Sequence, residues 1–303
     1  MMIRKKLIIL FFFIIAVSAQ AQYVSSPDTI YKHRLRTTVI SAGVLYGATM
    51  TTLWYLWYKD YPHTGFHWIN DNKEWLHLDK MGHMTTVYTT SGYLYEALRW
   101  SGIDNTKATL YGALTGWGFM ASVEFLDGLS AEWGASWGDI VANTTGAALF
   151  VSQQLLWKEQ RIRIKFSYSP SPYAQYRPDL LGENHWQRII KDYNGETFWL
   201  SANIASFIHK DSKFPKWLNV AVGYGGKGML GAYSNPPEYN GQPLPDFNRV
   251  QQYYLSLDVD WTRIKTNSAV LRTVFKVFSF VKLPFPALEY NKEDGLVGHW
   301  MFF

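Results

Sequence analysis

The chain has 303 residues with 29 lysines and arginines, 24 aspartates and glutamates, no cysteine and a formal net charge of +5. Without cysteine it can form no disulfide bond and offers no thiol for lipid attachment, so core packing must stabilise the fold. Three basic residues precede residue 7, and removing them with a predicted signal peptide lowers the net charge to about +2, too little to indicate nucleic-acid binding.

Residues 1–21 have the pattern of a secretory signal peptide. A basic segment at residues 4–6 precedes an uninterrupted apolar run at residues 7–17, and Ala19-Gln20-Ala21 supplies small side chains before the cleavage point. The apolar run is too short to span a bilayer core of about 30 Å. We therefore expect an exported protein that begins at Gln22, in the periplasm or outer membrane of a Gram-negative bacterium.

Residues 22–158 have the hydrophobic pattern of a helical domain. The predicted helices cover residues 37–58, 83–100, 107–127 and 138–158. The first is long enough to cross a bilayer, although its threonines make it only moderately hydrophobic. Small residues recur in the later helices and let backbones approach closely, as in membrane-type or tightly packed bundles. We expect one bundle of about four helices that contacts the membrane or lies within it.

Residues 159–303 change to the period of two that is typical of β-strands. Residues 161–168 and 255–262 alternate strictly between apolar and polar side chains, which indicates strands with one buried and one wet face. We therefore expect Asp258 and Asp260 on the wet face. Further predicted elements are strands at 197–206 and 217–224, a strand end with a tight turn at 223–228, a loop at 234–247, an amphipathic helix at 268–281 and a terminal strand ending at 303.

The predicted fold class is α+β. An N-terminal bundle of about four helices carries a buried polar site, and a C-terminal antiparallel β region of about six strands follows with one amphipathic helix.

The polar site is predicted from charged residues inside otherwise apolar helical stretches. Asp79 and His83 lie four residues apart and share a helix face, where the carboxylate would fix the imidazole tautomer and leave one nitrogen free. Glu124 and Asp127 share a face at the end of their helix, where negative charge opposes the helix dipole by roughly 0.3–1 kcal/mol. Burying several carboxylates is costly unless they are paired, so we expect them to converge on one centre.

The next helix offers a compensating N-terminus. Ser136 is the predicted N-cap, Asp139 follows three residues later, and Asn143 extends the polar face by one turn.

Three accounts of this centre remain open. In the first, it is a structural network that clamps the helices together around a neutral His83. In the second, it binds a polar ligand or a divalent metal ion, the one cofactor that the sequence indicates, through His83, Glu124, Asp127 and Asp139. In the third, the protein is a membrane-proximal hydrolase or transferase that acts on lipid or cell-wall precursors, with His83 in proton transfer and Asp79 orienting it. The sequence leaves open whether the protein is an enzyme.

Three strings of residues carry a resemblance to known families. They are Asp79-Lys80-x-Gly82-His83, Glu124-x-x-Asp127-Gly128 and Ser136-Trp137-Gly138-Asp139-x-x-x-Asn143-x-x-Gly146. They resemble an uncharacterised envelope family typified by the periplasmic lipoprotein YfiM. The run 70–75 and the β-rich tail resemble the Bacteroidetes-type version, and the order of the signals is more distantly similar to the VanZ-like membrane family.

The resemblance implies a helical envelope domain whose marked residues are Asp79, Lys80, His83, Glu124, Asp139 and Asn143. Tryptophan and tyrosine favour membrane interfaces, and aromatic residues make up 17% of the chain. We therefore expect membrane or outer-membrane components as partners, and the β region could dock one of them. The oligomeric state is not predicted.

Overall fold

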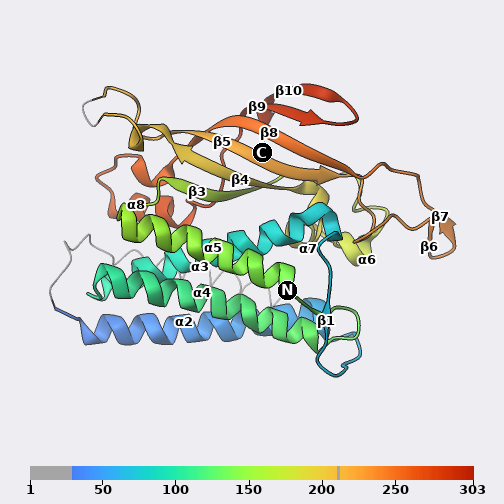
Figure 1. Cartoon of the computed structure of the whole chain (residues 1–303), viewed down its shortest axis with the longest axis horizontal. Coiled ribbons are helices and arrows are strands. Elements are labelled where there is room, and N and C mark those ends of the chain that lie inside the picture. The colour runs from blue at the N-terminus through green and yellow to red at the C-terminus, as the bar shows by residue number, and fades with distance from the viewer. Residues whose placement is uncertain (1–28, 210–211) are drawn as a thin grey trace.

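The computed structural model describes residues 29–209 and 212–303, so the predicted signal peptide lies outside the described residues. Helices from the first half of the chain form one side of the molecule and an antiparallel sheet from the second half forms the other (Figure 1). This confirms the predicted α+β class.

Four long helices form the helical side. They are α2 (Lys32–Leu53), α3 (Leu78–Trp100), α4 (Asn105–Gly128) and α5 (Trp137–Leu156). A π-helical turn at Trp54–Tyr58 extends α2. All four predicted helices are confirmed, and α3 begins earlier than predicted, which places Asp79, Lys80 and His83 on one helix. Figure 1 shows α2 on the side of the helical layer that faces away from the sheet.

Small residues allow the helices around α3 to pack closely. A Cβ atom at Gly146 of α5 would lie 2.3 Å from the carbonyl oxygen of Met84, and one at Gly116 of α4 would lie 2.9 Å from that of Val87. Neither approach is possible with a larger side chain, so the recurring small residues do permit the close packing expected from the sequence.

The sheet has six antiparallel strands in the order β10-β9-β8-β5-β4-β3. Their bounds are β3 (Ile162–Tyr168), β4 (Glu196–Asn203), β5 (Leu218–Lys227), β8 (Val250–Val259), β9 (Phe285–Asn291) and β10 (Gly295–Phe302). The predicted strands, the glycine-rich strand end and the amphipathic helix, α8 (Ala269–Val277), are present with different ends. Short 3-10 turns at Ile204–Ser206 and Trp261–Arg263 replace the last residues of two predicted strands, and β9 was not predicted. Shorter elements not predicted are β1 (Trp68–Ile69) paired with β2 (Ala135–Ser136), β6 (Glu238–Tyr239) paired with β7 (Gln242–Pro243), α6 (Pro178–Leu181) and α7 (His185–Lys191).

The prediction that Asp258 and Asp260 lie on a wet face is wrong. Both side chains are fully buried, and the Asp258 carboxylate lies 2.7 Å from the ammonium nitrogen of buried Lys165. Arg163 pairs with Asp260 in the same way, at 3.5 Å. The alternation is real but its faces are reversed along most of the strand, because the apolar positions before Asp258, Leu255 and Leu257, are exposed, while Val259 is buried.

The helices and the sheet share a hydrophobic core. Trp75 and Leu78 pack in one cluster with Leu181, Phe198 and Met229, which come from the second half of the chain. The change from helix to strand occurs between the end of α5 and the start of β3, close to residue 158. The division into two domains at that point stays a prediction.

One helix in the described part of the chain, Lys32–Tyr58, is long and apolar enough to cross a membrane by length and composition, with a mean hydropathy of 1.3.

Candidate functional site

The chain enters α3 through an unusual turn. Trp75, Leu76 and His77 all have positive φ angles, 46°, 54° and 71°, which non-glycine residues adopt rarely and at an energetic cost. Trp75 is buried, and the Tyr224 hydroxyl donates a hydrogen bond to the Leu76 carbonyl. These contacts hold the turn and so fix where α3 begins and where Asp79 lies in its first turn.

Lys80 forms ion pairs with three aspartates. Its ammonium nitrogen lies 2.7 Å from Asp71, 3.1 Å from Asp79 and 2.9 Å from Asp139, the last on α5. Burial alone would lower the pKa of Lys80, but the attraction of Asp79 and Asp139 outweighs it and raises the pKa. Lys80 therefore remains a cation and links α3 to α5 and to the segment before α3.

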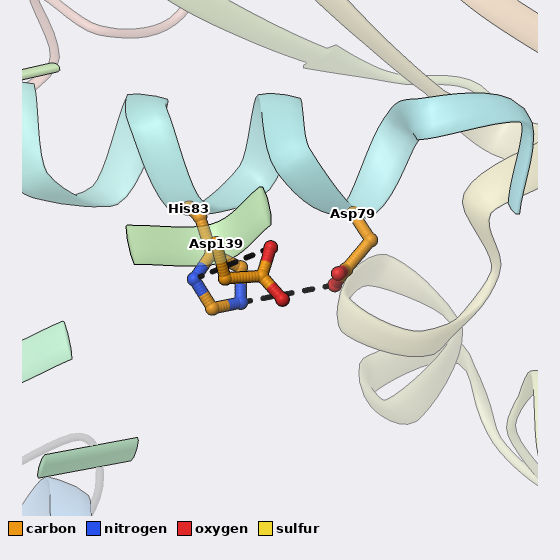
Figure 2. Close-up of side chains that lie close together, drawn as sticks. All are labelled: Asp79, His83 and Asp139. Atoms are coloured by element: carbon orange, nitrogen blue, oxygen red, sulfur yellow. Dashed lines mark ion pairs between the residues drawn. The ribbon is translucent and has the colours of Figure 1, made fainter. Parts of the chain in front are cut away.

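His83 lies between carboxylates on three sides. Its Nε2 atom is 3.8 Å from Asp79, and its Nδ1 atom is 3.5 Å from Glu124 and 3.9 Å from Asp139. Figure 2 shows one nitrogen of the imidazole paired with Asp79 and the other with Asp139. Burial lowers the pKa of His83, against the attraction of Asp79, so the ring is neutral and keeps one nitrogen able to accept a proton or bind a metal.

Asp79 is fixed by a contact from the second half of the chain. The Tyr193 hydroxyl donates a hydrogen bond of 2.8 Å to Asp79 Oδ1, the same oxygen that faces His83. Burial alone would raise the pKa of Asp79, but the Lys80 ammonium group and the hydrogen bond from Tyr193 oppose it and lower the pKa.

The N-terminus of α5 compensates the charge at the end of α4, as predicted. Ser136 is the N-cap of α5, and its Oγ accepts from the Asp139 amide at 3.3 Å. The Ser136 amide donates to Glu124 at 2.9 Å, and its hydroxyl donates to Asp71.

The three residues whose ligand atoms lie closest together are Asp79, His83 and Asp139. One ligand atom from each lies within 4.8 Å of the others. Asp127, predicted as a ligand, instead accepts a hydrogen bond of 2.6 Å from Tyr58 and is not part of this group. Asn143 is fully buried on the same helix as Asp139.

Several buried polar atoms around His83 lack a hydrogen bond. Within residues 29–209 and 212–303, the atoms without a partner include His83 Nδ1, Glu124 Oε1 and both amide atoms of Asn143. Buried polar atoms in proteins are almost always bonded. These atoms cluster around the imidazole of His83, whose Nδ1 atom lies 3.5 Å from Glu124 Oε1.

The site also holds more negative than positive charge. Asp71, Asp79, Glu124 and Asp139 surround one ammonium group. Burial raises the pKa of Glu124 to about 7, and burial together with Asp79 raises the pKa of Asp139. Both carboxyl groups therefore hold a proton more readily than an exposed carboxyl group does, which lowers the negative charge of the site.

A cavity of about 490 Å³ opens beside the site. Lys80, Met81 and Met84 of α3 and Trp137 and Gly138 of α5 contribute to its lining. Lys80, the common partner of the three aspartates, is thus part of the cavity lining.

The structure brings together six of the predicted residues, Asp79, Lys80, His83, Glu124, Ser136 and Asp139. Sequence reasoning missed Asp71, Tyr58 and Tyr193. Asp71 sits in the polar run Asn70-Asp71-Asn72, which is a usable signal, whereas nothing in the sequence ties Tyr193 to a residue more than a hundred positions away. The chemical roles of the predicted residues stay predictions.

The site lies in a segment of the chain that matches a known protein-family model. Residues 66–154 match a family model described as "Predicted periplasmic lipoprotein (DUF2279)", a segment that contains Asp71, His83, Glu124, Asp139 and Asn143. No curated protein and no solved structure matches the chain. The 303 residues contain no cysteine for lipid attachment, which departs from the lipoprotein description. The segment that carries the site is thus similar to predicted periplasmic lipoproteins, in agreement with the periplasmic localisation predicted from residues 1–21.

Proposed function

We propose that this exported envelope protein binds a divalent metal ion between Asp79, His83 and Asp139. Ligand atoms of these residues lie within 4.8 Å of one another and are largely buried. Carboxylate oxygens combined with one imidazole suit zinc, manganese or magnesium. Glu124 lies 3.5 Å from the Nδ1 atom of His83, on the other side of the ring from Asp79, and is not part of this group.

The observation that carries this proposal is the set of unbonded atoms around His83. A purely structural network would leave few buried polar atoms without partners, because each one weakens the fold. A cation would satisfy lone pairs on His83 and Glu124 and offset the excess of carboxylates.

The surrounding residues would act by orienting the ligands. Tyr193 holds Asp79, Ser136 caps the helix that carries Asp139, and Lys80 keeps the aspartates from repelling one another. Such outer contacts typically change metal affinity about 10- to 100-fold when they are removed.

The test is metal binding by the purified protein, measured by titration calorimetry with Mn²⁺ and Zn²⁺ and by elemental analysis. We expect one ion per chain, lost in Asp139→Asn and in His83→Gln. Asp127→Asn is the matched control, because Asp127 is a buried carboxylate of the same region that pairs with Tyr58 and should leave binding intact. Equal binding by wild type and Asp139→Asn, with both folded by circular dichroism, would contradict the proposal.

The cavity beside Lys80 favours a second function, a membrane-proximal hydrolase or transferase acting on lipid or cell-wall precursors. Here His83 transfers a proton and Asp79, held by Tyr193, orients it. In a strain that lacks the protein, His83→Gln should fold normally yet fail to restore an envelope defect. Full restoration by His83→Gln would rule this function out. With this second function we also propose that the protein lies at the outer membrane and is related to the YfiM and VanZ-like families.

A further inference from the structure

The sheet turns its polar face inward and its apolar face outward over β5, β8 and β9. Four polar residues of the inner face are fully buried: Lys165, Ser201, Asn219 and Asp258. The Asp258 carboxylate lies 2.7 Å from the Lys165 ammonium nitrogen and accepts a hydrogen bond of 2.6 Å from Ser201. Asn219 in turn donates to Ser201 at 2.8 Å. A sheet in water normally shows the opposite alternation, with its apolar face packed and its polar face solvated.

The outward side chains form aligned apolar rows. Leu200, Val222, Leu255 and Leu288 are direct neighbours across β4, β5, β8 and β9, and each is 42% to 54% exposed. Val220 and Leu257 form a second exposed row across β5 and β8. We call these six residues the outer apolar face: Leu200, Val220, Val222, Leu255, Leu257 and Leu288.

A row of tyrosines borders the outer apolar face at one end. Tyr253 and Tyr290 are paired neighbours across β8 and β9, are 48% and 52% exposed, and are called the tyrosine row. Tyr224, their neighbour on β5, is not part of it, because it packs against the core and bonds to the Leu76 carbonyl. Beyond this row the chain becomes charged, with Lys227 paired to Asp294. Exposed tyrosines beside an apolar surface are typical of membrane interfaces, because the ring is apolar and the hydroxyl group stays in water.

A second exposed apolar surface lies on the helical side of the molecule. Val39, Ile40 and Val44 of α2 are all exposed, and α2 lies away from the sheet (Figure 1). None of the most hydrophobic stretch of Lys32–Tyr58 is buried. A second copy docked on the sheet would cover only one of the two sides, whereas hydrocarbon surrounding the molecule covers both.

We propose that the outer apolar face contacts the hydrocarbon of a lipid bilayer, with the tyrosine row at the headgroup boundary. This face has a hollow of about 600 Å³ that acyl chains could occupy. Its lining includes Val220, Leu255, Leu257 and Trp300. The proposal is independent of metal binding, because no residue of the face contacts His83 or its neighbours.

The absence of native cysteine allows a direct test by site-directed spin labelling. Single cysteines would replace Val222, Leu255, Leu288 and Tyr290 in the full chain, in vesicles of phosphatidylethanolamine and phosphatidylglycerol. Glu238→Cys on the exposed β6 is the matched control in water. Because a polar nickel chelate is excluded from hydrocarbon, we expect the ratio of oxygen to nickel collisions to be roughly tenfold higher at Leu255 than at Glu238, and intermediate at Tyr290.

Two results would overturn the proposal. Nickel access at Leu255 equal to that at Glu238 would place the face in water, and low access to both probes with spin–spin broadening would place a second copy on it. A readout on the unmodified chain is photolabelling from a diazirine in the lipid tail, which should modify peptides of β5, β8 and β9. Labelling confined to α2 would contradict the proposal even if the cysteine variants failed to fold.

Discussion

At the scale of single residues, Lys80 allows three aspartates to share a buried site. Its distances of 2.7 to 3.1 Å to Asp71, Asp79 and Asp139 make it the common partner of groups that would otherwise repel one another. Removing one member of a buried ion pair is costly, because the remaining charges lose their compensation.

Lys80→Met should therefore lower the free energy of unfolding of the metal-free protein by about 3 kcal/mol or more. Added Mn²⁺ should recover part of the loss, because a cation would again offset the carboxylates. Lys276→Met is the control, since its ion pair with Glu96 is exposed and should contribute under about 1 kcal/mol. Denaturant unfolding measures both variants, and equal effects would contradict the role assigned to Lys80.

A second residue-scale prediction concerns pH. Burial lowers the pKa of Lys282 from 10.5 to about 8, against the attraction of Asp258. Between these two values the unfolded chain binds more protons than the folded chain, so this group makes the fold more stable as pH rises from 8 toward 10. Wild type should gain about 1–2 kcal/mol between pH 8 and 9.5 relative to Lys282→Met. Parallel pH profiles for the two proteins would exclude this contribution.

At the scale of elements, the site depends on how closely α5 approaches α3. Asp139 and Asn143 lie on α5, while Asp79 and His83 lie on α3. Gly146 permits the approach, because a Cβ atom there would lie 2.3 Å from the Met84 carbonyl oxygen.

Gly146→Ala and Gly118→Ala form a matched pair. Alanine favours a helix over glycine by roughly 1 kcal/mol, so Gly118→Ala, where a Cβ atom meets nothing within 4 Å, should raise the melting temperature. Gly146→Ala should lower it and weaken metal binding, because α5 must move away from α3. A rise in melting temperature for both variants would show that the helices are not packed as described.

Much of this element structure could be predicted from periodicity. The helices, the main strands and the convergence of Asp79, His83, Glu124 and Asp139 follow from spacing and from the cost of burying carboxylates. The direction of the sheet faces could not be predicted, because alternation gives two faces without saying which is buried, and here Asp258 is inside. The contribution of Tyr193 could not be predicted either, because it depends on tertiary packing between distant segments.

At the scale of the whole molecule, the helices and the sheet depend on each other. Phe198 of β4 and Leu181 of α6 complete the core around Leu78, and Tyr193 fixes Asp79 from outside the helical half.

A fragment spanning residues 29–158 should therefore fail to fold cooperatively. It would expose Trp75 and Leu78 and lose the Tyr193 hydrogen bond to Asp79. Thermal unfolding followed by circular dichroism should show a broad transition in the fragment and a sharp one in the full chain. A sharp transition with retained metal binding would instead support two independent domains divided near residue 158.

The most direct test of the central claim is anomalous X-ray scattering from crystals of the full chain grown with Mn²⁺ or Zn²⁺. Data collected on both sides of the absorption edge should give one anomalous peak among His83, Asp79 and Asp139, absent in Asp139→Asn crystals. The claim would be contradicted if crystals grown at saturating metal showed no anomalous peak near His83 and instead showed an ordered water bonded to His83 Nδ1 and Asn143.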